Sequence, residues 1–122
     1  MSHKTLVGAI QSKIWGTTQC MYVCEKSETH YLKINAGSFC SRHKHLMKWN
    51  RFCLLHGKLK VIIYRPNSED TTILEAGQFT DVPPGDFHRF EAIEDSECLE
   101  IYWVDDLDMF DIERSDSGGI KE

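Results

Sequence analysis

Three histidines in two short stretches of the chain have residue types and spacing that suit metal binding. His43 and His45 are separated by one residue, and His88 follows the turn-forming sequence Pro83-Pro84-Gly85. Residues i and i+2 of a β-strand point to the same face, because side chains alternate along a strand. Imidazole is a common ligand of zinc, copper, iron and nickel. The pair is therefore a candidate half-site for a metal, which His88 would complete.

The same histidines could instead be packed core residues, but a close pair and a third histidine after a rigid turn favour a metal site. We expect a divalent transition metal: zinc, iron, manganese or nickel. Asn50 follows the pair, and its neutral amide supplies no negative charge. We expect it to orient a ligand through a hydrogen bond, with weak ligation of the ion as the alternative. The chain must bend between Met47 and Asn50 if all these side chains are to converge.

Strand alternation also predicts which side chains surround the site. The candidate pocket residues, which share the inward parity of Asn50 or of His88, are Phe52, Leu54, His56 and Phe90. His56, like His30, could equally be a structural or surface histidine. The carboxylate nearest to His88 is Glu91, which has outward parity, so the sequence identifies no acid or base for catalysis.

Short strands separated by turn residues make up most of the chain. Runs rich in β-branched and aromatic residues predict strands over 20–24, 29–34, 58–65, 71–74, 79–82, 88–92 and 98–104, with a further strand through His43 and His45. Helical periodicity is almost absent. At least seven short strands at close spacing predict an antiparallel sandwich or barrel.

Length and composition predict one compact domain. The chain has 122 residues, of which 41% are hydrophobic and 27% charged, as in ordinary soluble domains with a single core. No apolar run reaches membrane-spanning length and no signal-peptide pattern is present, so we expect no membrane partner and a cytoplasmic location. The five cysteines lack Cys-x2-Cys spacing, which predicts buried thiols rather than a disulfide framework.

The net charge of -5 is confined to the C-terminal end. Residues 105–122 contain seven acidic and two basic residues, and the rest of the chain is balanced. A balanced domain lacks the basic field that nucleic-acid binding requires, so we expect no nucleic-acid partner. We interpret the acidic end as a solvated terminal segment.

The two histidine-bearing stretches resemble the two signature motifs of the cupin superfamily. Residues 37–57 fit G-x5-H-x-H-x4-E-x6-G at every fixed position but one, because Asn50 stands where the motif has glutamate. Residues 77–88 fit G-x5-P-x-G-x2-H, and Ala92 stands where the family has its closing asparagine. The resemblance implies an all-β fold, the cupin double-stranded β-helix or jelly-roll barrel, with a metal held by His43, His45 and His88.

The flanks resemble a narrower group. Lys13-Ile14-Trp15-Gly16 and residues 111–118 look like the edges of the C-terminal cupin domain of mannose-6-phosphate isomerase-type proteins, a match over roughly residues 13–118. In that family an acidic ligand follows the histidine pair, whereas Lys48 and Asn50 occupy the candidate positions here. We expect an N-terminal segment over 1–12, a cupin barrel over 13–104 and an acidic segment over 105–122. The resemblance also implies a homodimer, because cupin domains commonly pair through their sheets.

Three functions follow from these observations. The first is a sugar-phosphate isomerase or related sugar-binding protein, in which the metal would hold the substrate's oxygens and a base would move a proton. The second is a three-histidine iron dioxygenase of the thiol dioxygenase type, which the missing motif glutamate favours. The third is a metal-bearing module that binds a small molecule without catalysis. Each has a small molecule as its partner.

Overall fold

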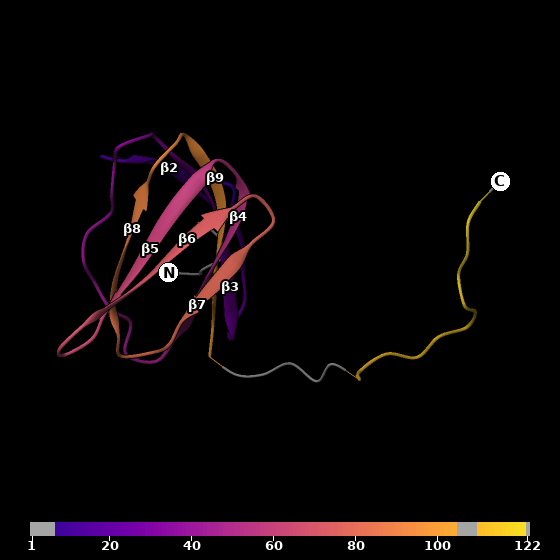
Figure 1. Cartoon of the computed structure of the whole chain (residues 1–122). Helices are drawn as coiled ribbons and strands as arrows, with labels where there is room; N and C mark the ends of the chain where they lie inside the picture. Colours follow the sequence, from indigo (N-terminus) through magenta and orange to yellow (C-terminus); the bar gives the residue numbers. More distant parts are fainter. Residues whose placement is uncertain (1–6, 105–109, 122) are drawn as a thin grey trace.

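The protein is built from antiparallel strands arranged in two facing sheets (Figure 1). The computed structural model describes residues 7–104 and 110–121. Its strands are β1 (Ile10–Lys13), β2 (Gly16–Val23), β3 (Ser27–Ile34), β4 (Trp49–His56), β5 (Lys58–Tyr64), β6 (Glu69–Glu75), β7 (Phe79–Val82), β8 (Phe87–Ala92) and β9 (Ser96–Trp103). The described residues contain no helix. The predicted all-β class and antiparallel architecture are confirmed.

The larger sheet has the strand order β1-β2-β3-β9-β4-β7, and the smaller has the order β6-β5-β8. The chain passes from one sheet to the other between β4 and β5, with only Gly57 between the two strands. Gly57 has φ +96°, and a Cβ atom there would lie 2.3 Å from the carbonyl oxygen of Asp95. Glycine is required at this crossing because it alone tolerates both the left-handed backbone and the close approach.

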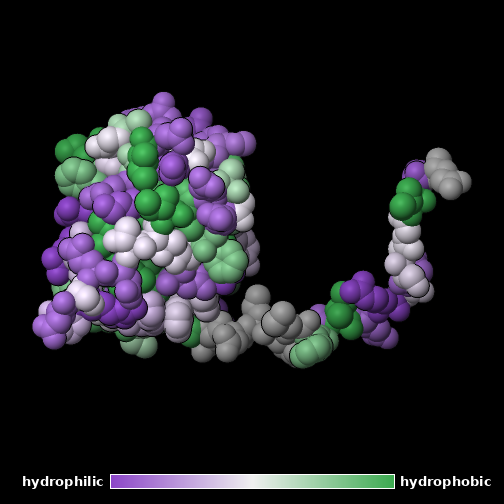
Figure 2. Space-filling view, viewed as in Figure 1, coloured by the Kyte–Doolittle hydropathy of each residue, from purple (hydrophilic) through white to green (hydrophobic). Residues whose placement is uncertain are grey.

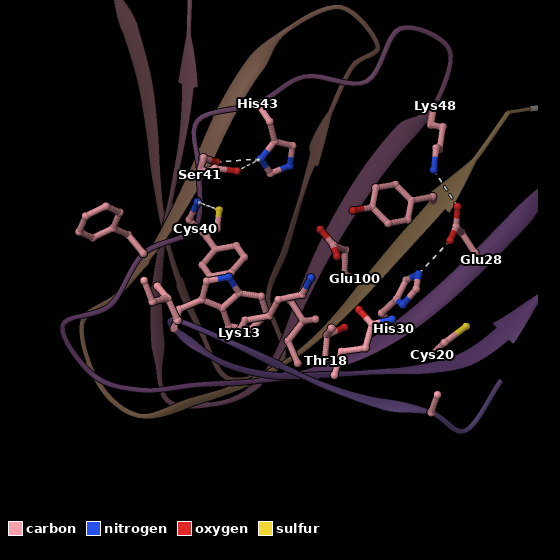
Figure 3. A pocket seen from close by; sticks show the side chains of 18 of the residues that line it. Lys13, Thr18, Cys20, Glu28, His30, Cys40, Ser41, His43, Lys48 and Glu100 are labelled. Atoms are coloured by element: carbon pink, nitrogen blue, oxygen red, sulfur yellow. Dashed lines mark hydrogen bonds and ion pairs between the residues drawn. The ribbon is translucent and has the colours of Figure 1, made fainter. Parts of the chain in front are cut away.

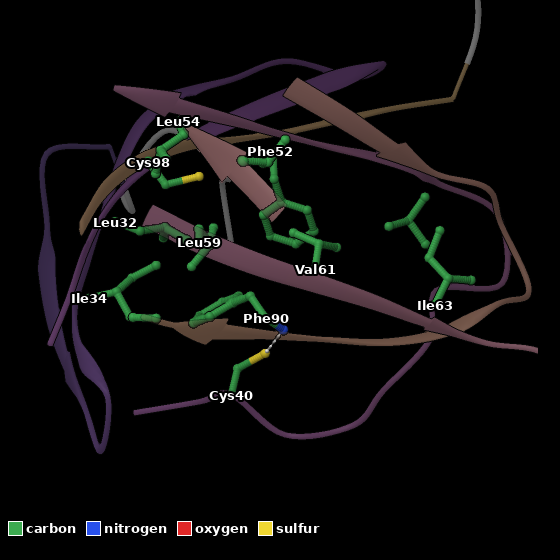
Figure 4. Packing of buried hydrophobic residues seen from close by; sticks show 13 residues of the cluster. Leu32, Ile34, Cys40, Phe52, Leu54, Leu59, Val61, Ile63, Phe90 and Cys98 are labelled. Carbon is green, nitrogen blue, oxygen red and sulfur yellow. Dashed lines mark hydrogen bonds between the residues drawn. The ribbon is translucent and has the colours of Figure 1, made fainter. Parts of the chain in front are cut away.

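Alternating inward side chains from both sheets form the core. Phe52 and Leu54 of β4 and Leu59 of β5 are completely buried, and they pack in one cluster between the sheets (Figure 4). Each such side chain stabilises the fold by about 1.5–3 kcal/mol relative to an exposed one. Trp15 closes one side of the core, where its ring meets Phe90 edge-on at 5.0 Å between centroids.

The prediction of a regular strand through His43 and His45 is wrong. Residues 35–48 run beside β8 but pair with it only at isolated bridges. The amide of Cys40 donates to the carbonyl of Phe90, and the amide of His43 donates to that of His88. Between these two contacts the segment advances three residues while β8 advances two. The extra residue bulges out and interrupts the ladder of hydrogen bonds.

The ends of the chain differ in how they join the fold. Ile10–Lys13, part of which lies in the expected N-terminal segment, pairs with β2 as an edge strand. At the other end, residues 110–121 are exposed and contain no strand, and residues 105–109 of the expected acidic segment lie outside the described residues. Over the barrel, hydrophilic residues surround small hydrophobic patches (Figure 2). The part of the chain that the structure describes has no helix long and apolar enough to cross a membrane.

Candidate metal centre

The three histidines meet where the irregular segment 35–48 lies against β8. His43 and His88 are opposite each other, and each amide donates to the other's carbonyl, at 3.1 and 2.8 Å. The amide of Gly85, in the turn before β8, donates to the carbonyl of His45 at 2.7 Å. The two motif stretches are therefore joined through their backbones at the residues that carry the imidazoles.

The imidazole rings converge. The ring centroids of His43 and His88 are 4.5 Å apart, those of His43 and His45 are 5.2 Å apart, and those of His45 and His88 are 5.5 Å apart. One potential ligand nitrogen from each histidine lies within 4.8 Å of the other two. One ion could therefore contact all three side chains.

Backbone carbonyls select which ring nitrogen is available for a metal. Nδ1 of His43 donates to the carbonyl of Ser41 at 2.7 Å, and Nδ1 of His88 donates to the carbonyl of Asp86 at 3.1 Å. Such bonds leave Nε2 unprotonated in a neutral imidazole. The Nε2 atoms of His45 and His88 are buried and have no hydrogen-bond partner among the described residues. Buried polar atoms of this kind are costly unless they bind a partner, and a metal ion would satisfy both.

The electrostatics favour the neutral form of two of the imidazoles, those of His45 and His88. Burial, followed by the neighbouring His43 and His88, lowers the pKa of His45 to about 4. Burial also lowers the pKa of His88. Neutral imidazole is the form that ligates metals, so the donor set fits a divalent transition metal. Cys40 does not offer a thiolate, because burial raises the pKa of its thiol to about 11.

Asn50 faces the interior. Its side chain is completely buried on β4, and neither amide atom has a hydrogen-bond partner in the described part of the chain. The chain bends at Leu46 and Met47, just before the interval between Met47 and Asn50 in which a bend was predicted. Asn50 is thus not a surface turn residue, and its unpaired amide faces the buried carboxyl of Glu100, whose pKa it acts to lower.

The predicted pocket residues take different positions. Phe90 lines the cavity beside the histidines, whereas Phe52 and Leu54 lie in the core cluster beneath it and do not line it. The ring of Phe52 packs against His88 at 6.1 Å. The placement of His56 in the pocket is wrong: its side chain is 75% exposed. The pairing of β4 with β9 shifts register between Leu54 and His56, and this bulge ends the inward alternation.

A cavity of about 550 Å³ opens beside the centre, between the larger sheet and the segment that carries His43 (Figure 3). Its apolar wall includes Trp15, Leu32 and Phe90. Polar side chains face it from several elements: Lys13, Thr18, Glu28, His30, Ser41, His43, Lys48, Glu100 and Tyr102. The cavity suits a small molecule with many hydrogen-bonding groups.

A fixed polar group forms one side of this cavity. Glu28 accepts hydrogen bonds from Lys48 at 2.7 Å and from His30 at 2.9 Å, as the dashed lines in Figure 3 mark. These bonds lower the pKa of Glu28 although burial acts in the opposite direction. Lys48 also lies over the ring of Tyr102, at 4.5 Å from its centroid. The carboxylate is therefore held in one position and ionised.

Glu100 is the functional candidate that sequence reasoning missed. It lies on β9 between Cys98 and Tyr102, is 9% exposed and lines the cavity. Burial raises its pKa above the ordinary value of 4.5, although Tyr102, His30 and His43 act in the opposite direction. The available signal was a glutamate at the same parity as Cys98 on β9, a position that alternation places on the inward face.

No protein-family model matches the chain, and no curated protein matches its sequence. Solved structures do match its fold. KdgF from Halomonas sp. aligns with a TM-score of 0.67 at 15% identity, over 80% of this chain and 89% of that one. The cupin domain of Schizosaccharomyces pombe Cnp3 aligns with a TM-score of 0.69 at 17% identity, over 80% and 69% of the two chains. This chain has the cupin fold.

A further match adds an enzyme with known metal centres. Oxalate decarboxylase from Bacillus subtilis, which has Mn(II) centres, aligns with a TM-score of 0.72 at 16% identity. The alignment covers 79% of this chain and 27% of that chain. At these identities the likeness concerns the fold. In this chain the feature that fits a divalent metal is the group of His43, His45 and His88.

Proposed function

We propose that this cupin binds one divalent transition metal through His43, His45 and His88 and acts on a sugar or sugar phosphate in the adjoining cavity. The observation that carries the proposal is the pair of buried, unpartnered Nε2 atoms of His45 and His88, whose rings converge with that of His43. When bound, the ion would supply Lewis-acid polarisation of a carbonyl or hydroxyl oxygen.

The cavity's own residues support a sugar-like ligand. Glu28, His30 and Lys48 offer fixed donors and acceptors on one side, and Trp15 offers an aromatic wall. Sugars have both hydroxyl groups and apolar C–H faces, so this combination suits them. Lys13 also lines the cavity and would supply a cation for a phosphate group.

Metal analysis tests the first half of the proposal. Protein purified without added metal, or titrated with Mn²⁺, Fe²⁺, Zn²⁺ and Ni²⁺ after chelation, should bind one ion per chain. A coupled assay with mannose 6-phosphate then tests for isomerisation. Absence of stoichiometric metal under every condition would contradict the metal site, whichever substrate is used.

One observation favours a second function. Among the described residues, the group within metal-binding reach consists of three histidines and contains no carboxylate, as expected for a three-histidine iron dioxygenase of the thiol dioxygenase type. Oxygen uptake by the Fe²⁺-loaded protein with small thiols tests this alternative. Stoichiometric metal with neither isomerisation nor oxygen uptake would favour a module that binds a small molecule without catalysis.

A further inference from the structure

Glu100 is a buried carboxyl group within the ligand cavity. It projects from the middle of β9 toward the interior, and Figure 3 shows it between His43 and the Glu28–His30 pair. The neighbouring Leu99 and Ile101 belong to the opposite face of the sheet. Any molecule that lies in the cavity beside His43 therefore also lies beside the carboxyl of Glu100.

The groups around Glu100 do not compensate its burial as an ion. No ion pair found among the described residues includes it, whereas Glu28 in the same cavity is paired with Lys48 at 2.7 Å. Tyr102, Asn50 and the imidazoles of His30 and His43 act on it. An ionisable group buried without a countercharge lowers stability. Glutamine or leucine would fill the position at lower cost if its role were packing alone.

We propose that Glu100 is the acid–base residue of this cupin and that it transfers a proton on an α-hydroxy carbonyl compound held in the cavity. This inference rests on the proposed function, because the polarised carbonyl oxygen that acidifies the neighbouring C–H group requires the metal site. Glu100, which lies outside both histidine motifs, would be the residue that moves the proton. The substrate would then be a compound with a hydroxyl group next to a carbonyl.

The proposed step is balanced. The carboxylate of Glu100 removes the proton from the carbon that carries the hydroxyl group, and the C–H electron pair becomes a C=C bond while the carbonyl π electrons move to oxygen, which gives an enediolate. The proton of the original hydroxyl group passes to the oxygen of the former carbonyl, and the oxygen that loses it forms the new C=O bond as the C=C electron pair takes the proton back from Glu100 at the former carbonyl carbon. One C–H bond and one O–H bond break and one of each forms, so the step needs no oxidant, reductant or co-reactant.

The environment favours such a role. Glu100 lines the cavity, is 9% exposed and belongs to no ion pair among the described residues, so its carboxyl is free to exchange a proton with a bound molecule. Burial raises its pKa above the ordinary value. Glu28 is suited to a different task, because its bonds to Lys48 and His30 keep it ionised and fixed. The cavity thus contains two carboxyl groups whose environments push their pKa values apart, a pattern that marks acid–base assignments.

Hydrogen exchange in D₂O tests the proposal. The proteins are the wild type, Glu100→Gln, Glu100→Asp and the control Glu91→Gln, in which the carboxyl on β8 lies 3.6 Å from Lys60 and is partly exposed. Each is loaded with Mn²⁺, its metal content is measured, and it is incubated with dihydroxyacetone, D-mannose or mannose 6-phosphate. Proton NMR follows loss of the C–H signal next to the carbonyl.

We expect wild-type exchange with at least one probe and a loss of about a hundredfold or more in Glu100→Gln, as for removal of an acid–base group. Glu100→Asp should retain part of the rate, and Glu91→Gln all of it. Metal content should be equal in the four proteins. Melting of the metal-free proteins at pH 8 gives a readout independent of turnover: Glu100→Gln should melt higher than the wild type, and Glu91→Gln should not.

Failure of the proposed role of Glu100 and failure of the proposed metal site give different results. Fully metal-loaded wild type that exchanges none of the probes, or a Glu100→Gln variant that exchanges at the wild-type rate, would overturn the role of Glu100 and leave the metal site standing. Wild type that binds no metal would overturn the proposed function and this inference with it.

Discussion

His43 and His88 face each other across an antiparallel bridge, and their rings lie 4.5 Å apart between centroids. Residues directly opposite in such a pair have their side chains on the same face of the sheet. The distance between the two imidazoles is therefore determined by backbone hydrogen bonds of 3.1 and 2.8 Å. His43 and His88 of the candidate centre are thus held by direct backbone pairing, although the segment that carries His43 is otherwise irregular.

Replacing His88 should abolish metal binding. His88→Ala removes a buried ligand, so the metal-dependent gain in stability should disappear. That gain is about 2.7 kcal/mol for the wild type at an ion concentration a hundredfold above Kd, or on the order of 10 °C in Tm. The measurement is the difference in Tm between metal-loaded and chelator-treated protein. His56→Ala is the control, because that side chain is 75% exposed. An unchanged difference in His88→Ala would show that the assignment is wrong.

Restoring the motif carboxylate should tighten metal binding. Asn50→Glu places a charged oxygen at a completely buried inward position near the three candidate histidine ligands, which favours a divalent cation by about tenfold or more. Asn50→Gln is the matched control, since it adds the same length without the charge. Titration of the three metal-free proteins with Mn²⁺ or Zn²⁺ at one pH compares them. Equal affinities would remove position 50 from the site.

The stability of the metal-free protein should depend on pH through Glu100. Burial raises the pKa of Glu100 in the folded state above 4.5, so its protonated form is stabilised by folding. This contribution is complete below about pH 4.5 and is lost as the pH rises through the folded-state pKa, by up to about 1.4 kcal/mol per pH unit. His30, His43 and Tyr102 face the same carboxyl. All three remain in Glu100→Gln, so a comparison of that variant with the wild type isolates the contribution of Glu100.

Comparing wild type with Glu100→Gln isolates that contribution. Chemical denaturation at intervals from pH 4.5 to 8 should give similar free energies of unfolding at the acidic end, with the variant increasingly more stable toward pH 8. Two curves that stay parallel across the range would contradict a buried, uncompensated carboxyl.

Replacing Gly57 by alanine should cost more stability than the same replacement at Gly77. Gly57→Ala meets the carbonyl oxygen of Asp95 at 2.3 Å in addition to a left-handed backbone, whereas Gly77→Ala meets the backbone cost alone, with no atom within 4 Å. We expect Gly77→Ala to cost about 1–2 kcal/mol and Gly57→Ala clearly more. Denaturant unfolding of both variants measures this order. Equal losses would mean that the crossing from β4 to β5 relaxes around the added methyl group.

The sequence predicted most of the strands and the three histidines because both are local properties. Alternation of apolar residues determines which face of a strand is buried, and turn residues such as Pro83 and Gly85 determine where a strand ends. Parity alone also predicts a bend close to Met47, and the chain bends at Leu46 and Met47. The same reasoning failed at His56 and in the stretch through His43, because a single extra residue in a bulge reverses or interrupts the alternation without a signal in composition.

Only the tertiary structure brought Glu28, His30 and Glu100 into one cavity with His43. Parity indicates that each of these residues points inward, but it does not indicate which strands are neighbours. The sheet order β3-β9-β4 places Glu100 next to the strand of His30 on one side and that of Asn50 on the other, although Glu100 is 70 positions from His30 and 50 from Asn50 in the chain. Pairing between distant strands is decided by the packing of the whole core, so the acid–base candidate could be identified only once the sheets had been assembled.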